Sequence, residues 1–352
     1  MIDGGAGRAV LTAAAGSMQV VDRAPPTEPG PGQVLVRPEA VGVCGSDYHF
    51  LTGELVTPPA FGPQFPRVQG HEVGGTVLAV GTGVREGISA GQRVAVWPLS
   101  SCGSCYACRS GRGNACPNFQ LIGIHTDGAL QSQFVVDAGQ VFPVDDLTPE
   151  VAAFCEPISI AVHALQRGRV AAGEHVVAMG AGPIGQAVVL AARERGAEVL
   201  VTDLVPGRLE LARRGGAQVL DLTQEQDVVG AVRAWAGPEG PELVVDCTGV
   251  PGAIRSGVDW VAPTGRMVIV GISHAEVSLP VNAFTDREID VLGSTVCTAE
   301  DFAEAVVIAG RHAEQVSRLV THRRPLEEAP AAIEHAMAHP GEVMKLVILP
   351  GG

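Results

Sequence analysis

The chain has 352 residues, 46% of them hydrophobic and 18% charged, which is typical of a two-domain globular protein rather than a disordered one. Its net charge of −14 argues against a nucleic-acid partner, because phosphate binding needs a basic face. No apolar run approaches the ~20 residues of a membrane span, and the glycine-rich stretch from Met1 to Arg8 lacks the apolar core of a signal peptide. We therefore expect a cytoplasmic protein without a membrane partner.

Residues 9–152 are expected to be mostly β-structure. Short β-rich segments such as Gln33–Arg37 and Gly74–Val80 are separated by glycine and proline. Closely spaced short strands predict a small barrel-like domain. The proline-rich stretch 53–66 is expected to be either a surface connection or a wall of a substrate site.

The segment Gly42–His49 combines three side chains suited to chemistry at a metal. Cys44 offers a thiolate for zinc, Ser46 a hydroxyl that can lie beside the group zinc activates, and His49 an imidazole that can pass a proton outward. A lone cysteine is more often a buried apolar residue, but here further candidate ligands follow. They are His71, Glu72 and Glu156.

Four cysteines follow with the spacing C-x2-C-x2-C-x7-C on a glycine-rich loop: Cys102, Cys105, Cys108 and Cys116. Four thiolates can close tetrahedrally around one zinc ion and leave no open position, so the spacing predicts a structural zinc site. An iron–sulfur cluster or a pair of disulfides are the competing interpretations, and each requires a different chemistry or an oxidising compartment.

From about residue 153 the pattern changes to alternating strands and helices. An apolar strand, Glu174–Met179, leads into a G-x-G-x-x-G pattern, and an amphipathic helix, Gln186–Arg195, leads out of it. The next strand ends at Asp203, about 20 residues further on, which is typical of a dinucleotide-binding unit whose acidic residue accepts the ribose hydroxyls. The pattern consists of Gly180, Gly182, Pro183, Ile184 and Gly185, with Ala181 between the first two glycines.

Further strand–helix units continue this domain. In a doubly wound sheet the ligand lies outside the carboxyl ends of the strands, so the residues at those ends are candidates to line the cofactor. They are Thr248, Gly249, Val270, Gly271 and Ser294. Helices near 301–309 and 327–337 and a strand at 345–349 are expected to return the chain to the first domain. We therefore expect a discontinuous domain, 1–152 with 298–352, around a cofactor domain, 153–297.

Together these segments resemble the zinc-dependent medium-chain alcohol dehydrogenases, and most closely their polyol (sorbitol) dehydrogenase branch. The matching segments are 42–47, 70–72, the four-cysteine loop, 156–163, the glycine pattern, and 201–203 with Arg208. The resemblance implies an α/β protein with a GroES-like β-barrel catalytic domain and a Rossmann doubly wound parallel-sheet domain. It also implies a homodimer or homotetramer.

The resemblance assigns Cys44, His71 and Glu72 to a catalytic zinc, with Glu156 bound directly or one water away. Ser46 then touches the alcohol, and His49 is the outer end of a proton relay. Asp203 predicts NAD over NADP, because it would face a 2′-phosphate with a like charge; Arg208 could meet that phosphate, although the polyol branch has it alongside the Asp in NAD enzymes. The implied reaction is reversible oxidation of a secondary alcohol to a ketone. We also expect two zinc ions per chain. Alignment of the segment Glu156–Ser159 with the family's pattern favours Glu156 over its neighbour Cys155 as the remaining zinc ligand. We expect Cys155 to be a packing residue.

One segment departs from the polyol branch. That branch places an Arg-Tyr pair after the glycine that matches Gly293, whereas Ser294–Cys297 occupy these positions here. Sugar acids, cyclitols, aminocyclitols and simpler secondary alcohols therefore remain open as substrates, and a linear hexitol is disfavoured. Two other classes of protein stay open at this stage: a catalytically silent relative that binds NADH, and a zinc-ribbon binding module.

Overall fold

The computed structural model describes residues 7–55, 64–273 and 275–351. By its contacts the chain divides into two compact units, Met1–Glu156 with Thr298–Gly352, and Pro157–Cys297. The expectations for the first six residues and for most of the proline-rich stretch lie outside the described residues. Within the described part, no helix combines the length and apolar character needed to cross a membrane.

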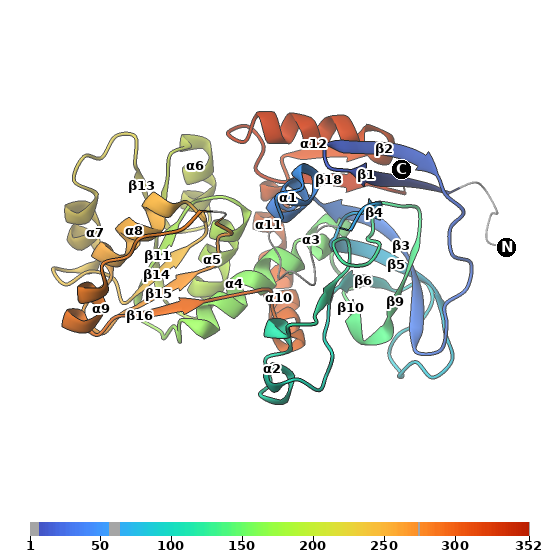
Figure 1. Cartoon of the computed structure of the whole chain (residues 1–352), viewed down its shortest axis with the longest axis horizontal. Coiled ribbons are helices and arrows are strands. Elements are labelled where there is room, and N and C mark those ends of the chain that lie inside the picture. Colours follow the sequence, from blue (N-terminus) through green and yellow to red (C-terminus); the bar gives the residue numbers. More distant parts are fainter. Residues whose placement is uncertain (1–6, 56–63, 274, 352) are drawn as a thin grey trace. The chain divides into compact units, whose positions relative to one another are not determined.

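The first unit is built on antiparallel β-structure (Figure 1). Its largest sheet has the order β10 (Val141–Pro143), β6 (Arg93–Val96), β5 (Glu72–Val80), β3 (Gln33–Gly42), β18 (Leu346–Leu349) and β17 (His322–Pro325), with β9 (Phe134–Asp137) also paired to β3. A second sheet orders β2 (Ser17–Asp22), β1 (Arg8–Ala14) and β4 (Arg67–Val68), and β7 (Leu99–Ser100) pairs with β8 (Gln120–Leu121). The helices of this unit are α1 (Gly45–Thr52), α2 (Tyr106–Arg109), α3 (Pro149–Ala153), α10 (Ala299–Arg311), α11 (Ala313–Leu319) and α12 (Ala329–Ala338).

The pairing of β3 with β5 brings the end of β3 next to the start of β5. Val34 and Val36 of β3 and Val73 and Val77 of β5 are buried in one apolar core. Because a one-residue slip would turn these valines to the other face, the core fixes the register. In that register Gly42 lies opposite Glu72, so the chain leaving β3 and the chain entering β5 are neighbours.

The second unit is a six-stranded parallel sheet (Figure 1). Its order is β13 (Gln218–Asp221), β12 (Glu198–Asp203), β11 (His175–Met179), β14 (Leu243–Asp246), β15 (Arg266–Ile269) and β16 (Asp290–Gly293). The chain order reverses between β11 and β14, which is the switch point where doubly wound sheets bind ligands. Its helices are α5 (Pro183–Glu194), α6 (Pro206–Arg214), α7 (Val228–Ala236), α8 (Pro251–Trp260) and α9 (Val281–Arg287), and α4 (Cys155–Arg167) leads into it. The expected combination of a β-sheet domain and a doubly wound parallel sheet is confirmed.

Some element ends differ from those expected. Helix α5 begins at Pro183 rather than Gln186, because proline is well placed at the first helical position and Gly182 serves as the N-cap. Strand β18 begins at Leu346 rather than Lys345, whose side chain turns into a buried ion pair. Helices α10 and α12 cover the two expected helical stretches, with each end shifted by one or two residues.

Candidate functional site

Three of the four proposed catalytic-metal ligands converge at the end of β3 and β5. Cys44 follows β3 as the N-cap of α1, while His71 directly precedes β5 and Glu72 is its first residue. One ligand atom from each of the three lies within 4.8 Å of the others. His71 and Glu72 are buried and Cys44 is partly buried. A partly buried thiol with a buried imidazole and a buried carboxylate at this separation forms a ligand set suited to zinc.

The His71 ring is oriented by neighbours on both of its nitrogens. Asp47 Oδ1 lies 3.6 Å from Nδ1, and Ser46 Oγ lies 3.4 Å from Nε2. Gln69 Nε2 donates to Asp47 Oδ1 at 3.2 Å, and Thr12 Oγ1 donates to Gln69 Oε1 at 2.6 Å. A carboxylate behind one imidazole nitrogen is the usual arrangement that presents the other nitrogen to a metal.

A buried lysine that the sequence reasoning missed contacts Glu72. Lys345 is 2% exposed, and its Nζ donates to Glu72 Oε1 at 2.6 Å and to Val43 O at 3.0 Å. Glu72 Oε2 lies 2.5 Å from the same Nζ but makes no hydrogen bond of its own. Glu72 therefore lies in a buried ion pair with Lys345, in which only one of its carboxylate oxygens accepts a hydrogen bond.

The electrostatics of this cluster favour positive charge at its centre. Burial works against charge on His71, but Asp47 and Cys44 raise its pKa well above the ordinary value. His71 Nδ1 is buried and has no hydrogen-bond partner among the described residues. Burial raises the pKa of Glu156 to about 7, a shift that His71 opposes and Glu72 reinforces. A divalent cation would supply the charge that these groups otherwise take from protons, so the residues fit a zinc ion.

Glu156 lies near this cluster but outside its closest group. Its pKa responds to His71 and Glu72, yet its carboxylate is not among the ligand atoms within 4.8 Å of one another. The neighbouring Cys155 is fully buried, and its Sγ donates to Val151 O at 3.7 Å. Burial raises the pKa of the Cys155 thiol to about 12, so it stays protonated and packs as an apolar residue.

Ser46 and His49 both lie on α1, three residues apart. Side chains at this spacing share one face of a helix, so the hydroxyl and the imidazole follow one another along the helix surface. Ser46 Oγ is the member beside His71, and His49 lies near the carboxyl end of the helix. This order suits a path that leads a proton away from the ligand cluster.

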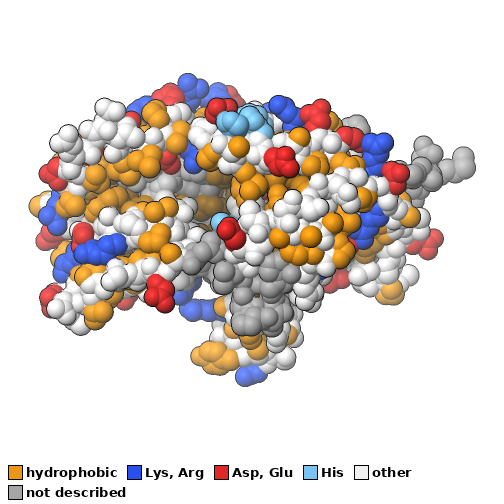
Figure 2. All heavy atoms as spheres, turned by 45° about the horizontal axis from the view of Figure 1, so that its top comes forward, with side chains coloured by type: hydrophobic (Ala, Val, Ile, Leu, Met, Phe, Trp, Pro, Cys, Tyr) orange, Lys and Arg blue, Asp and Glu red, His pale blue; other side chains and the backbone are white. Residues whose placement is uncertain are grey.

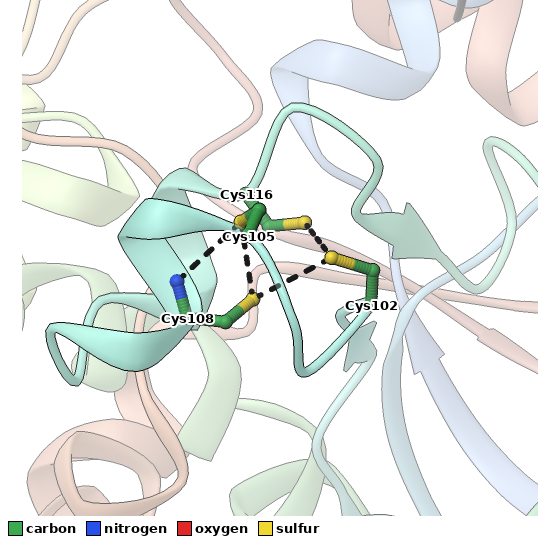
Figure 3. A group of neighbouring side chains, drawn as sticks. All are labelled: Cys102, Cys105, Cys108 and Cys116. Atoms are coloured by element: carbon green, nitrogen blue, oxygen red, sulfur yellow. Dashed lines mark hydrogen bonds between the residues drawn. The ribbon is translucent and has the colours of Figure 1, made fainter.

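The four cysteines of the loop 102–116 also converge (Figure 3). Their Sγ atoms are separated by 3.4 Å for Cys105 and Cys108, 3.5 Å for Cys102 and Cys116, and 3.9 Å for Cys102 and Cys108. Four sulfurs around one zinc at 2.3 Å would lie about 3.8 Å apart, so the loop fits a closed tetrahedral site. Backbone amides at Ser104 and Cys105 lower the pKa of Cys102 to about 6, which favours the ligating thiolate.

The glycine pattern forms a tight turn between β11 and α5. A Cβ atom on Gly185 would lie 1.8 Å from Gly180 O, so only glycine allows this helix to start so close to the strand. Gly182 is the N-cap, and Pro183 and Ile184 form the first helical positions. The free backbone N–H groups at this helix N-terminus can donate hydrogen bonds to a pyrophosphate.

Asp203 ends β12 beside this turn and is largely buried. Its Oδ2 accepts from Ala181 N at 2.6 Å, and its Oδ1 accepts from Val205 N at 2.8 Å. Arg208 lies on α6, and its backbone carbonyl accepts a hydrogen bond from Gln186 Nε2 at 2.9 Å. The acidic residue is thus fixed at the edge of the turn, where an adenosine ribose would lie.

The remaining cofactor candidates lie at the carboxyl ends of β14, β15 and β16. Buried Asp246 accepts from Thr248 Oγ1 at 2.6 Å and from Gly249 N at 3.1 Å. Gly271 approaches this turn so closely that its Cβ would lie 2.0 Å from Gly249 N, and Val270 directly precedes it. Ser294 follows β16, and its Oγ is buried without a hydrogen-bond partner in the described part of the chain, as a residue awaiting a ligand would be.

Comparison with known proteins decides the family. An alcohol dehydrogenase GroES-like domain matches residues 30–146, and a zinc-binding dehydrogenase domain matches residues 183–309. L-galactonate-5-dehydrogenase from Escherichia coli K12 is 34% identical over 321 residues, covering 91% of this chain and 92% of the relative. The chain belongs to the zinc-binding alcohol dehydrogenase family. Sorbitol dehydrogenase from Bacillus subtilis, 34% identical over 327 residues and 90% of each chain, places this dehydrogenase close to the polyol branch.

A solved structure agrees with this placement over the whole length. A zinc-binding dehydrogenase from Sinorhizobium meliloti, bound to NADP, matches this dehydrogenase with a TM-score of 0.88 and 32% identity. The match covers 98% of this chain and 100% of that one. The dehydrogenase is therefore an enzyme of the GroES-like and Rossmann-type fold, and the alternative that the protein is a zinc-ribbon binding module is wrong.

Proposed function

We propose that this dehydrogenase oxidises a secondary alcohol to a ketone with NAD, using a zinc ion held by Cys44, His71 and Glu72. The observation that carries the proposal is that the Cys44 thiol, the His71 imidazole and the Glu72 carboxylate lie within 4.8 Å of one another, with the Ser46 hydroxyl 3.4 Å from the imidazole. Glu156 completes the ligand set directly or through one water. Zinc bound there supplies a Lewis acid that lowers the pKa of the alcohol toward neutrality.

The chain's own residues then handle the proton and keep the ligands in place. Ser46 Oγ is close enough to the ligand cluster to accept a hydrogen bond from the substrate hydroxyl, and His49 can pass the proton toward solvent. Asp47 lies beside Nδ1 of the His71 ring, and Lys345 holds the Glu72 carboxylate by a buried hydrogen bond. NAD supplies the hydride acceptor.

Asp203 favours NAD over NADP in this proposal. Its carboxylate accepts two backbone amides at the end of β12 and is held where a ribose 2′-hydroxyl would be bound. A 2′-phosphate at that place would meet a like charge. The remaining cofactor contacts are proposed at Gly180, Gly182, Pro183, Ile184, Gly185, Arg208, Thr248, Gly249, Val270, Gly271 and Ser294.

The substrate class is proposed from the relatives and from one departure. The names of the two relatives point to a sugar acid and a hexitol. Because Ser294–Cys297 replace the Arg-Tyr pair of the polyol branch, we favour a sugar acid, a cyclitol, an aminocyclitol or a simpler secondary alcohol over sorbitol.

A second, structural zinc ion is proposed at Cys102, Cys105, Cys108 and Cys116. We also propose a homodimer or homotetramer in the cytoplasm, where thiols stay reduced, because none of the eight cysteines is disulfide-bonded. The domain boundaries proposed are 1–152 with 298–352 for the catalytic domain and 153–297 for the cofactor domain.

A substrate screen that follows NADH formation tests this proposal. Zinc-loaded wild-type enzyme is assayed with NAD against polyols, sugar acids, cyclitols and aminocyclitols, beside Ser46→Ala. The expected result is turnover of at least one secondary alcohol, reduced about 10²- to 10⁴-fold in Ser46→Ala. A zinc-loaded, folded wild type that binds NADH but turns over none of these alcohols would instead indicate a catalytically silent relative.

A further inference from the structure

Lys345 is the only lysine in the sequence, and the other members of its 24 lysines and arginines are all arginine. Its side chain is 2% exposed, so the basic side chains spread over the surface in Figure 2 are arginines. A lysine is almost never buried so completely unless it is paired. The one lysine therefore lies where the fold buries a compact cation, and its contacts indicate its role.

The Lys345 ammonium group contacts three segments of the first compact unit. Its Nζ donates to Glu72 Oε1 at 2.6 Å, at the start of β5, and to Val43 O at 3.0 Å, between β3 and α1. It also lies over the Phe154 ring, 5.9 Å from the ring centroid, where the face of the ring attracts a cation. All three partners are buried. One side chain near the end of the chain therefore joins three segments that are distant from it in sequence.

These three segments carry the proposed zinc ligands. Val43 directly precedes Cys44, and Glu72 is itself one of the ligands. Phe154 lies two residues before Glu156, between α3 and α4. The position of the ammonium group therefore affects every segment that contributes a ligand.

The backbone of Lys345 is itself held in place. Lys345 directly precedes β18, where Val347 pairs with Gly42 of β3. Its carbonyl accepts hydrogen bonds from Thr321 N and His322 N, each at 3.1 Å. The ammonium group therefore extends from a fixed point of the largest sheet.

The space for the Glu72 carboxylate depends on Gly42. A Cβ atom on Gly42 would lie 2.0 Å from Glu72 Oε2 and 3.1 Å from its Cδ. The carboxylate therefore lies against the backbone of Gly42, with Lys345 Nζ 2.5 Å from the same Oε2. A side chain at residue 42 would push the carboxylate away from the position in which the lysine holds it.

We propose that Lys345 is a positioning residue for the catalytic zinc: it holds the Glu72 carboxylate, and the chain next to Cys44, in the arrangement that binds the ion. The inference rests on the zinc site proposed above. A hydrogen-bond partner behind a metal ligand orients that ligand, and its loss typically costs 10- to 100-fold in metal affinity. The positive charge of the lysine also offsets the carboxylate, which would otherwise be buried without a partner.

Competition with a chelator for the zinc of the loaded enzyme tests the proposal. Lys345→Met keeps the approximate length of the side chain and removes the ammonium group, so the zinc at Cys44 should be held about 10- to 100-fold more weakly. Gly42→Ala keeps the lysine but displaces the carboxylate, and it should weaken the same zinc ion. Zinc in the four-cysteine loop should be held as in the wild type by both variants.

Arg266→Met is the matched control, because Arg266 also forms a largely buried ion pair, with Glu174, in the other compact unit. It should lower the free energy of unfolding and leave zinc affinity unchanged. The proposal is overturned if folded Lys345→Met holds the zinc at Cys44 as tightly as the wild type does. It is also overturned if that variant holds the ion more tightly, since the lysine would then compete with zinc for Glu72.

A second measurement needs no substitution at Lys345 and so decides the proposal even if Lys345→Met does not fold. Because the chain has one lysine, isotopic labelling of lysine gives a single side-chain signal in the NMR spectrum. In the wild type this signal should move when the zinc at Cys44 is removed and return when it is restored. In Cys44→Ala it should not respond to zinc.

The two proposals fail in different ways. A lysine signal that ignores zinc, in a wild type that binds zinc at Cys44 and oxidises its alcohol, would overturn the role of Lys345 alone. A wild type that binds no zinc at Cys44 would overturn the proposed function and this inference with it.

Discussion

At the scale of single residues, Cys155 and Glu156 are adjacent yet face different surroundings. The Cys155 thiol donates to a helix carbonyl and has its pKa raised to about 12, whereas the pKa of Glu156 depends on His71 and Glu72. Cys155→Ser should therefore keep zinc and most activity, while Glu156→Ala should lower zinc retention or turnover by about 10- to 100-fold. Zinc analysis and kcat/KM measure both effects. Loss of the catalytic zinc in Cys155→Ser, with Glu156→Ala unaffected, would reverse the ligand assignment.

Cofactor choice is a second property of one residue. Asp203→Ala removes the carboxylate that accepts from Ala181 N and Val205 N, and with it the like charge that would face a 2′-phosphate. We expect kcat/KM with NAD to fall and the preference for NAD over NADP to narrow by about tenfold or more. Equal kcat/KM values for NAD and NADP in the wild type would contradict the assignment.

The sequence could predict the ligand types but not everything that holds them. Cys44, His71 and Glu72 were predictable because their chemistry and their place next to β-rich segments favour zinc. Lys345 was not predictable, because its partner Glu72 is 273 positions away in the chain and an isolated lysine normally indicates an exposed surface. The contact of Asp47 with the His71 ring was not predictable either, because it forms only when the fold brings His71 next to Asp47.

At the scale of elements, the four-cysteine loop should owe its conformation to a metal. Its sulfurs are 3.4 to 3.9 Å apart, and the described loop consists mainly of turns around the short helix α2. Cys108→Ser should remove one zinc and lower the free energy of unfolding by about 2 kcal/mol or more, since metal binding and folding of such loops are coupled. Denaturant unfolding measures this, and an unchanged midpoint with zinc retained would refute it.

The parallel sheet offers a prediction with a defined pH dependence. Glu174 lies just before β11. Arg266, at the start of β15, donates hydrogen bonds to both of its carboxylate oxygens, at 2.9 and 2.6 Å. Burial works to raise the pKa of Glu174, but Arg266 and the amide of Ala171 hold it below its ordinary value of 4.5. The stabilisation is therefore present above that value and is lost as the pH falls through the lowered pKa.

Glu174→Gln should accordingly cost about 1 to 3 kcal/mol at neutral pH, and the difference from wild type should shrink in acid. Glu210→Gln is the control, because Glu210 pairs with Arg213 and Arg214 at an exposed position where such pairs contribute little. Unfolding of all three proteins at several pH values tests this, and a Glu174→Gln penalty that persists unchanged in acid would contradict it.

Among the elements, those with a strong local signal were predicted best. The strand, glycine turn and helix around residue 180 were predictable because glycine and proline fix the turn locally. Helix α1 was not predicted, because its eight residues lack an apolar stripe and it forms where the N-cap Cys44 and Asp47 close its first turn. The return of a strand near 345–349 to the first domain was predicted, but its place between β3 and β17 was not, because no local pattern encodes which strands pair.

At the scale of the whole molecule, the described residues include two candidate metal-ligand sets of unequal character. The set at Cys44, His71 and Glu72 has three closest ligands and a hydroxyl beside it, so it can admit a substrate. The four-cysteine set is complete in itself and can admit none. Both sets belong to the same compact unit, Met1–Glu156 with Thr298–Gly352, so loss of one ion need not unfold the site of the other.

Zinc analysis of three proteins tests this division most directly, after gel filtration with a weak chelator that removes ions from exposed sites. We predict two zinc ions per chain in the wild type, and one each in Cys44→Ala and Cys108→Ser. Cys44→Ala should be folded and without turnover, whereas Cys108→Ser should keep residual turnover at reduced stability. One zinc ion per chain in the wild type, or a Cys44→Ala protein that retains two ions and full activity, would contradict the account.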